Sequence, residues 1–475
     1  MAKAPRYKKK NHKTLWYIAI IILVLLGVLC KRNNNDIELQ DLLSKSSDIH
    51  SVNLNVKEII APQSKIKAYL VEDKTNPIIS INFSFLNSGY VFDKKGKKGL
   101  AKLTSLLINE GTTELSSMEL KDELELKAIR VRFDVDKDDF MGSLLTTKDN
   151  LFRAVELINN MLTKPRLGDE DIKRIKIQLQ EGLKRQIENP YQELQLAFAE
   201  EIYKNHPYAD NPLGKKEDIK HISANDMREF VKKYLRKDNV IVGIVGDITE
   251  FEAQKILDIM FNGLEAGNDL NEITVPKIDF DGRNRKIARN GGQNISMVAL
   301  KSVKRNDKDF YPLFVANHIL GGAGLTSKLS QQVREQEGLT YGIYSYLLIN
   351  DNAPLMVMSF SATKDNYMKA NESWRKIFND FRNKGVNSKE LQKAKDYLIG
   401  SYNLRFASIE NISEILTAMQ KYNLGLDFLQ KRNEYIKKIN IEEVNDVAKK
   451  YFDVNKIISA EIGEFQGEDE CSETK

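Results

Sequence analysis

Short runs of hydrophobic residues, rich in β-branched side chains, recur along the chain. Some alternate with polar positions, as in PIISINFSFLNSG (77–89) and PLMVMSFSAT (354–363), whereas NVIVGIVGD (239–247) is almost continuously apolar. Long charged segments with helical periodicity lie between such runs, for example 169–187 and 388–404. Strands interleaved with amphipathic helices predict an α/β (α+β) sandwich in which helices cover a sheet.

The chain contains an internal repeat. The 30 residues that begin at Ile219 align without gaps with those that begin at Ile436, so that Gly246 corresponds to Gly463. The offset is 217 residues, and the two charged helical segments align with each other at nearly the same offset. Both copies end in a helix followed by a β-branched strand. The sequence therefore predicts two homologous domains in tandem.

The N-terminal region has a different pattern. A basic stretch (1–14) precedes an uninterrupted apolar run (15–30) that has Trp16 and Tyr17 at its start. This arrangement favours an uncleaved, single-pass anchor in a bacterial inner membrane, with a cytoplasmic N-terminus and a periplasmic or otherwise extracytoplasmic body. The run is short for a membrane span, so a cleaved signal peptide and a buried core helix are the alternatives. GVLCKR offers no small-x-small cleavage pattern.

The net charge of +5 originates in this N-terminal region. Residues 1–32 carry eight basic and no acidic side chains, which leaves 64 basic against 67 acidic residues, a net charge of −3, for the rest. A body of this charge lacks the basic surface that nucleic-acid binding requires, so nucleic acid is excluded as an expected partner. The two cysteines, Cys30 and Cys471, can form neither a disulfide framework nor a thiolate metal site.

These patterns divide the chain into seven segments, two of which are the homologous domains. They are a basic cytoplasmic tail (1–14), a transmembrane anchor (15–30), a polar tether (31–51), a first domain (52–262), a polar linker (263–294), a second domain (295–465) and an acidic tail (466–475).

The segment GLAKLTSLLINEGT (99–112) carries a resemblance to a known family. Together with FSFLNSGYVFDKKGKK before it and NHPYADNPLG and VGIVGDI after it, it resembles the insulinase-like metallopeptidases, which include pitrilysin and the mitochondrial processing peptidase. The resemblance extends over residues 52–465 and implies two domains that form a clamshell. In active members this helix carries His-x-x-Glu-His, which supplies two zinc ligands and a carboxylate beside the attacking water.

The metal positions that the resemblance implies are degenerate in this chain. The His, Glu and His positions hold Lys102, Ser105 and Leu106. Lysine repels a cation, serine is a poor zinc ligand and no general base, and leucine cannot coordinate a metal. The third ligand of the family, a glutamate in the region of QLQEGLKRQIENP, corresponds to Gly182, with Glu181 beside it. The resemblance therefore implies a zinc site that has been lost.

No other catalytic centre is evident in the sequence. No two histidines lie at metal-ligand spacing on one element, and no serine or cysteine has the context of a nucleophile. The histidines are His12, His50, His206, His221 and His318. We therefore expect no cofactor on this chain.

A second motif of the family is retained in LGGAGLTSKLSQQVREQEGLTYGIYSY (320–346). It has a glycine loop, which the resemblance places at the substrate site, although a helix C-cap with a tight turn is the alternative interpretation. The glycines are Gly321, Gly322 and Gly324.

The same motif contains Arg334 and Tyr341, seven residues apart. In active relatives the resemblance implies that the equivalent side chains reach the zinc site from the opposite domain and hold the substrate backbone or its developing oxyanion. Arginine and tyrosine are suited to that task as hydrogen-bond donors. The alternative for Arg334 is a surface ion pair with Glu335 or Glu337.

Some members of this family are two-chain enzymes, in which one chain supplies His-x-x-Glu-His and the other supplies only the arginine and tyrosine. This sequence resembles the second kind. It therefore predicts a subunit, inactive alone, of a heterodimeric, membrane-associated metalloendopeptidase whose related partner carries the intact motif and the zinc. Extended peptides or unfolded segments would be held by β-strand addition to a sheet edge. The competing hypothesis is a non-enzymatic envelope scaffold or peptide-binding protein.

Overall fold

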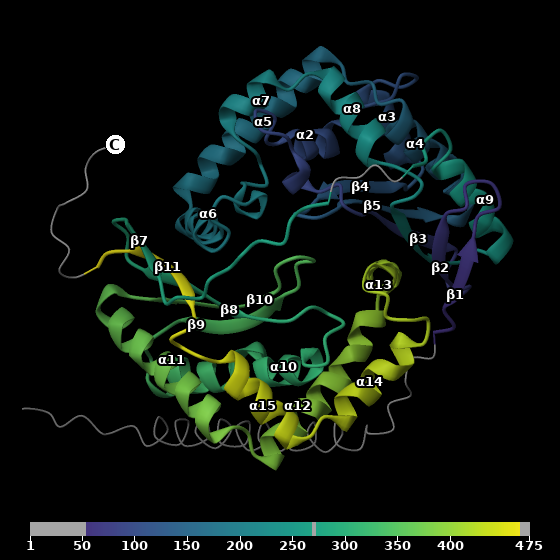
Figure 1. Cartoon of the computed structure of the whole chain (residues 1–475). Helices are drawn as coiled ribbons and strands as arrows, with labels where there is room; N and C mark the ends of the chain where they lie inside the picture. The colour runs from purple at the N-terminus through teal and green to yellow at the C-terminus, as the bar shows by residue number, and fades with distance from the viewer. Residues whose placement is uncertain (1–53, 268–271, 466–475) are drawn as a thin grey trace, which may run out of the picture. The chain divides into compact units, whose positions relative to one another are not determined.

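The computed structural model describes residues 54–267 and 272–465, which are called the first half and the second half below. Each half contains a β-sheet with helices packed against it (Figure 1). The mixed α/β class predicted from the sequence is therefore confirmed. The predicted anchor (15–30), the tether and the acidic tail lie outside the described residues. Within the described ranges, no helix is long and apolar enough to cross a bilayer.

The sheet of the first half has six strands in the order β1-β2-β6-β3-β5-β4. Neighbouring strands are antiparallel, except that β2 and β6 are parallel. The strands are β1 (Lys57–Ile60), β2 (Lys67–Glu72), β3 (Ile78–Phe85), β4 (Arg130–Val135), β5 (Phe140–Thr147) and β6 (Val240–Gly246). The α-helices are α2 (Leu100–Leu107), α3 (Ser117–Leu126), α4 (Leu151–Thr163), α5 (Asp169–Glu188), α6 (Pro190–Ile202), α7 (Lys216–His221), α8 (Ala224–Tyr234) and α9 (Glu250–Met260).

The sheet of the second half has five strands in the order β7-β11-β8-β10-β9, again with one parallel pair, β7 and β11. The strands are β7 (Asn284–Ala288), β8 (Asn294–Lys301), β9 (Gly342–Leu348), β10 (Leu355–Ala362) and β11 (Ile458–Gly463). The α-helices are α10 (Phe310–Asn317), α11 (Lys364–Lys384), α12 (Ser388–Gly400), α13 (Ile409–Lys421), α14 (Phe428–Lys438) and α15 (Ile441–Tyr451). With β1 set aside, the two sheets have the same strand order.

The repeat also appears in backbone geometry. Gly246 and Gly463, which the sequence alignment pairs, end β6 and β11 with φ angles of 139° and 147°. A Cβ at Gly246 would lie 2.2 Å from the carbonyl oxygen of Ile78, and one at Gly463 would lie 2.3 Å from Oδ1 of Asn294. Both positions therefore need glycine for the same reason, a left-handed φ beside a close neighbouring strand.

One predicted element differs from the structure. The polar linker expected over 263–294 contains β7, whose sequence is NRKIA. The strand lies at the edge of its sheet and its side chains are exposed or half-buried. An edge strand of this kind has no run of buried apolar residues, so its hydrophobic pattern is too weak to predict it.

The faces of the two sheets are covered reciprocally. Helix α6 of the first half packs on β7, β8 and β11 of the second sheet, while α13 of the second half packs on β2, β3 and β6 of the first sheet. Successive residues of β8 point to opposite faces of the second sheet. Met297 lies in one hydrophobic cluster with Leu194 of α6, and Val298 lies in another with Trp374 of α11. Both faces of the sheet are therefore buried.

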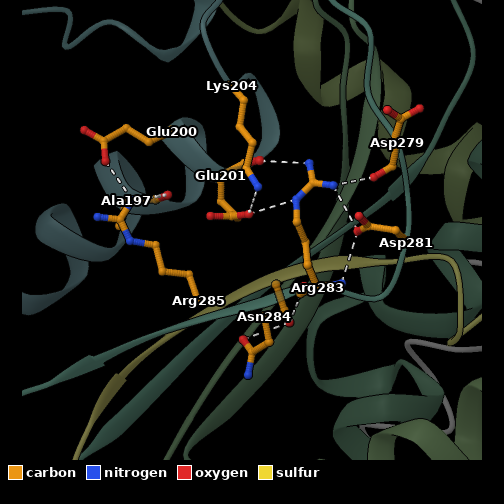
Figure 2. A network of polar contacts seen from close by, with 10 residues as sticks. Ala197, Glu200, Glu201, Lys204, Asp279, Asp281, Arg283, Asn284 and Arg285 are labelled. Atoms are coloured by element: carbon orange, nitrogen blue, oxygen red, sulfur yellow. Dashed lines mark hydrogen bonds and ion pairs between the residues drawn. The ribbon is translucent and has the colours of Figure 1, made fainter. Parts of the chain in front are cut away.

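Polar contacts hold α6 against β7 and the segment that precedes it (Figure 2). The guanidinium of Arg283 points toward α6, where Nε lies 2.8 Å from Glu201 Oε1 and Nη2 donates to the Glu201 carbonyl oxygen at 3.0 Å. Beside it, Nη1 of Arg285 on β7 lies 2.7 Å from Oε2 of the adjacent Glu200. Because Arg283 is mostly buried and makes several bonds, its contact fixes the helix more strongly than the exposed pair does.

The contact between α13 and the first sheet is close and lined by small residues. Ser413 Oγ lies 2.9 Å from Ser80 Oγ of β3, and Thr417 Oγ1 donates to the carbonyl oxygen of Asn82 at 3.1 Å. At the end of the helix, Lys421 Nζ forms buried ion pairs with Asp139 (2.6 Å) and Asp351 (3.1 Å). Ion pairs thus hold the helix at one end, and hydrogen bonds and close packing hold it along its length.

A substitution at Gly243 of β6 tests the close packing of α13 on the first sheet. A Cβ at this position would lie 2.3 Å from the carbonyl oxygen of Ser413. We predict that Gly243→Ala forces α13 away from the sheet and lowers the free energy of unfolding by about 1–3 kcal/mol, measured by denaturant titration. Gly400→Ala, in a helix and with open space around the added methyl, is the control and should leave stability equal or slightly higher. Equal effects of the two substitutions would contradict the close contact.

Candidate functional site

The start of α2 is fixed by Asp93. The amides of Gly99 and Ala101 donate to its two carboxylate oxygens at 2.8 and 3.0 Å. Gly99, the N-cap residue, has a φ of 100°, and a Cβ there would lie 3.0 Å from the carbonyl oxygen of Leu213. Burial raises the pKa of the Asp93 carboxyl to about 7, although the amide hydrogen bonds oppose that shift. The helix therefore begins at a rigid, glycine-dependent turn.

Lys102 lies where the resemblance places the first zinc-binding histidine. Its Nζ is 2.7 Å from Oδ1 of Asp134 on β4, and both side chains are partly buried. Burial acts to raise the pKa of Asp134, but the hydrogen bonds from Lys102 and from the Val135 amide, together with the charges of Lys102 and Arg132, outweigh it and lower that pKa below the usual range. An ammonium group held in this position repels a second cation.

Ser105 and Leu106 occupy the other two degenerate positions on α2. Ser105 is fully buried, and its hydroxyl donates to the carbonyl oxygen of Lys102 at 2.8 Å. Its hydroxyl hydrogen is therefore already used within the helix. Leu106 is half-buried and packs against the cluster that includes Ile175 and Leu179 of α5. The face of α2 that would hold zinc in an active relative is therefore an ordinary packing surface.

The position expected for the third zinc ligand also has no side chain that could coordinate a metal. Gly182 lies in α5, and a Cβ there would lie 3.2 Å from Leu213 Cδ1. The neighbouring Glu181 is exposed and forms an ion pair with Lys184 at 3.2 Å. No carboxylate takes the place of the missing glutamate on this face of the helix.

Glu110 anchors the far end of α2. Its carboxylate lies 2.8 Å from Lys121 Nζ and 2.7 Å from Arg174 Nη2, and it accepts a hydrogen bond from Ser117 at 2.5 Å. Burial acts to raise its pKa, but these three hydrogen bonds outweigh it and lower the pKa to about 2. One buried carboxylate thereby connects the end of α2 to α3 and α5.

This donor set does not fit zinc. A catalytic zinc needs three nitrogen, sulfur or carboxylate ligands, and α2 and α5 offer an ion-paired ammonium, a bonded hydroxyl, a leucine and a glycine. Over residues 54–267 and 272–465, no group of three or more His, Cys, Asp or Glu could hold a metal ion. His206, His221 and His318 lie on separate elements, and His12 and His50 lie outside the described residues.

The glycine loop of the second motif has a packing role. Gly321 lies within a π-helical turn (His318–Gly322), and a Cβ there would lie 2.3 Å from Ser345 Oγ of β9. Ser345 Oγ donates to Asn317 Oδ1 at 2.7 Å, which ties the same turn to the strand. A Cβ at Gly322 would lie 3.1 Å from Asn317 Nδ2, and Gly324 has a φ of 57° in open space. Close approach to β9 explains Gly321, the short distance to Asn317 accounts for Gly322, and backbone conformation explains Gly324.

Arg334 and Tyr341 are both available to a ligand. Arg334 is half-buried on a second π-helical turn (Ser330–Gln336), and within the described residues it forms no ion pair with Glu335 or Glu337. Glu337 instead accepts a hydrogen bond from Gln332 at 2.8 Å. Tyr341 is 71% exposed, directly before β9. The structure does not support the surface ion pair considered for Arg334.

The backbone around Tyr341 is held firmly. Thr340 Oγ1 donates to the carbonyl oxygens of Ser361 and Gly342, and the Gly342 amide donates back to it at 3.1 Å. In the part of the chain that the structure describes, no hydrogen bond, ion pair or ring contact joins Arg334 or Tyr341 to α2. The two motifs are therefore separate sites within this chain.

The comparisons with known proteins agree with this pattern. Residues 69–216 match the family described as insulinase (peptidase family M16), and residues 221–398 match the peptidase M16 inactive domain. The chain belongs to peptidase family M16. In this M16 chain, the degenerate positions all lie within the first matched region and the retained motif lies within the second.

Its relatives include a protein named as a non-peptidase homologue and a protein named as a zinc protease. The non-peptidase homolog YmxG of Helicobacter pylori is 28% identical over 404 residues, which is 84% of this chain and 92% of that protein. The zinc protease PqqE of the same organism is 24% identical over 263 residues, 53% of this chain and 57% of that one. The crystal structure of a peptidase M16 inactive domain from Pseudomonas fluorescens aligns with a TM-score of 0.81 and 26% identity, covering 86% and 98% of the two chains.

Glu110 gives a test of how α2 is held. Because its pKa is lower in the folded protein than in the unfolded chain, it adds stability above about pH 4.5, and this contribution is lost as the pH falls toward 2. We predict that Glu110→Gln destabilises the protein at pH 7 and that the difference from wild type shrinks toward pH 2. Denaturant titrations at several pH values measure it. Glu335→Gln, at an exposed position, should show no such trend, and a constant difference for Glu110→Gln would contradict the assignment.

The donor set predicts the metal content. The purified chain should retain far less than one equivalent of zinc after dialysis, because a tight site needs ligands that α2 and α5 do not supply. Elemental analysis measures this directly. Lys102→Ala removes the repelling charge without adding a ligand, so it should stay equally metal-free. About one zinc per chain in either protein would overturn the interpretation of the site.

Proposed function

We propose that this chain is the zinc-free, substrate-binding subunit of a heterodimeric, membrane-associated metalloendopeptidase that acts on extended peptides or unfolded segments. The observation that carries the proposal is the ion pair of Lys102 with Asp134 at the position that the resemblance assigns to the metal. Within the described residues, the side chains of Arg334 and Tyr341 form no hydrogen bond or ion pair. One half of a catalytic apparatus is absent and the other half is accessible. The missing half would come from a related chain with an intact His-x-x-Glu-His helix.

The relatives support the existence of such a partner. In Helicobacter pylori, a protein named as a non-peptidase homologue and a protein named as a zinc protease both match this chain. An organism that keeps an inactive and an active member of one family has the components for a two-chain enzyme. Membrane association is supported by the basic and apolar N-terminal sequence (1–30) alone.

A peptide can bind to this fold through a sheet edge. Among the described strands, β4 pairs only with β5 and β9 pairs only with β10, so each has one free edge. Strand addition to such an edge uses backbone hydrogen bonds and tolerates varied peptide sequences. Tyr341 directly precedes β9 and Lys102 is paired to β4, so both motifs lie beside an available edge.

The retained motif tests the proposal. If Arg334 and Tyr341 stabilise charge in a reaction performed on the partner's zinc, Arg334→Ala or Tyr341→Phe should lower the turnover of the reconstituted heterodimer roughly 10²-fold. Assembly should be unchanged, because Tyr341 is exposed, Arg334 is half-buried and neither side chain is paired within the described residues. Turnover of a peptide library is measured at matched concentrations of complex, confirmed by sedimentation. Glu335→Ala, on the same turn as Arg334, is the control and should retain wild-type turnover.

A second candidate is a non-enzymatic envelope scaffold or peptide-binding protein. It is favoured by the glycine loop, because close packing on β9 accounts for Gly321 without any substrate. The same experiment separates the two functions. Wild-type turnover in both motif variants, or a native complex that contains no zinc-binding partner, would favour the scaffold.

A further inference from the structure

Three arginines converge on a cluster of aromatic rings in the second half. The guanidinium of Arg305, in the loop before α10, lies over the ring of Phe310 at 4.2 Å. That of Arg432, on α14, lies over the ring of Tyr402 at 4.0 Å. Arg405 lies on the same short 3₁₀-helix as Tyr402, Ser401–Phe406. The site thus combines residues from three elements that are distant in sequence.

None of these arginines has an acidic partner within the described residues. Arg432 is only 7% exposed, and Arg305 is half-buried, yet neither forms an ion pair there. Burial, and in addition the charges of Arg405 and Arg305, lower the pKa of Arg432 to about 10, so it remains charged at neutral pH. Buried charges in proteins are normally paired, and stacking on aromatic rings offsets only part of the cost of leaving them unpaired.

The arginines retain free hydrogen-bond donors. Nη1 of Arg432 donates to the carbonyl oxygen of Leu398 at 2.7 Å and to Asn433 Oδ1 at 2.9 Å. Its other guanidinium nitrogens have no acceptor in the described residues, and they are not among the polar atoms sealed from solvent. Arg305 makes a side-chain hydrogen bond with Tyr311, and none of its guanidinium nitrogens is among the sealed, unpaired atoms either. The donors that remain on both arginines therefore point to accessible space. Arg405 is exposed.

We propose that Arg305, Arg405 and Arg432 bind a phosphate group. Donors that approach from three elements require an anion with more than two acceptor oxygens, and phosphate has these, whereas a carboxylate has two. Arginine is the side chain best suited to bind such an anion, because its planar fork stays charged and donates two parallel hydrogen bonds. The bound anion would neutralise the like charges that now face one another.

The position of the site favours the headgroup of an anionic phospholipid as the source of the phosphate. Leu54, the first described residue, packs in the cluster that contains Phe428 and Tyr311, and its carbonyl oxygen accepts from Gln430 Nε2 at 3.1 Å. The apolar run 15–30 precedes Leu54 by 24 residues in the sequence, so the site lies close to the first described residue after the proposed tether. The choice of lipid rests on the membrane association proposed above, but the phosphate site does not depend on a peptidase partner.

Binding to the purified full chain in a neutral detergent tests the site. Inorganic phosphate is titrated at constant ionic strength against chloride, and soluble dihexanoyl phosphatidylglycerol against the matching phosphatidylcholine, with the thermal unfolding midpoint as the readout. Phosphate and phosphatidylglycerol should each raise the midpoint saturably, as expected for a ligand that binds only the folded state. Tighter binding of phosphatidylglycerol supports the lipid source, and equal or tighter binding of inorganic phosphate supports a soluble one.

The variants decide whether these arginines are responsible. Arg405→Gln removes an exposed side chain and should fold normally, and combined with Arg305→Gln it should weaken phosphate binding at least tenfold. Arg228→Gln, at an exposed position in the first half, is the matched control and should bind as wild type. Absence of a saturable effect with either ligand, or unchanged binding in both Arg405→Gln and the double variant, would overturn the site. Neither result bears on peptide turnover, so the test stands apart from that of the subunit function.

Discussion

The structure depends on the reciprocal placement of α6 and α13. Each sheet has helices of its own half on one face, and its other face is covered by one helix that belongs to the other half. Without these two helices, the strands β3, β6, β8 and β11 would expose an apolar or small-residue face to water. The two halves are therefore not independent units joined by a linker, because each completes the core of the other.

The placement of α2 does not depend on a metal ligand. The structure around α2 is maintained by Asp93 at one end and Glu110 at the other, and neither residue would be a zinc ligand. Between them, Lys102 and Asp134 supply a local charge pair where the family places a cation. Evolution could change the donor set on one face of α2 while its anchors, and the strand edges beside it, stayed in place.

Much of the architecture could be predicted from the sequence, because the repeat and the hydrophobic periodicity are both local or regularly spaced signals. The strands at 78–85, 240–246, 355–362 and 458–463 and the helix at 169–188 lie where the pattern indicates. β7 was not predictable, since an edge strand with charged residues carries no apolar alternation. The exchange of α6 and α13 was not predictable either, because periodicity shows which face of a helix is buried but not which sheet it meets.

For the candidate site, the sequence identified the degenerate positions and the retained motif, but not the interactions around them. The pairing of Lys102 with Asp134 joins residues that no spacing rule connects. The ion pair considered for Arg334 followed from local sequence, where Glu335 and Glu337 are close, yet the π-helical turn directs Glu337 to Gln332. The clash that a side chain at Gly321 would make with β9 depends on tertiary contact and has no sequence signal.

The position of α13 also sets an order for the chain's own maturation. All strands of the first sheet have been synthesised once the ribosome has passed Gly246. One face of that sheet stays uncovered until synthesis has reached Lys421, the last residue of α13. Contacts between residues so distant in sequence form slowly, and an uncovered sheet face in the meantime invites aggregation. The nascent first half therefore carries an uncovered apolar sheet face during most of the synthesis of the second half, and a chain truncated before α13 would lack the helix that covers this face.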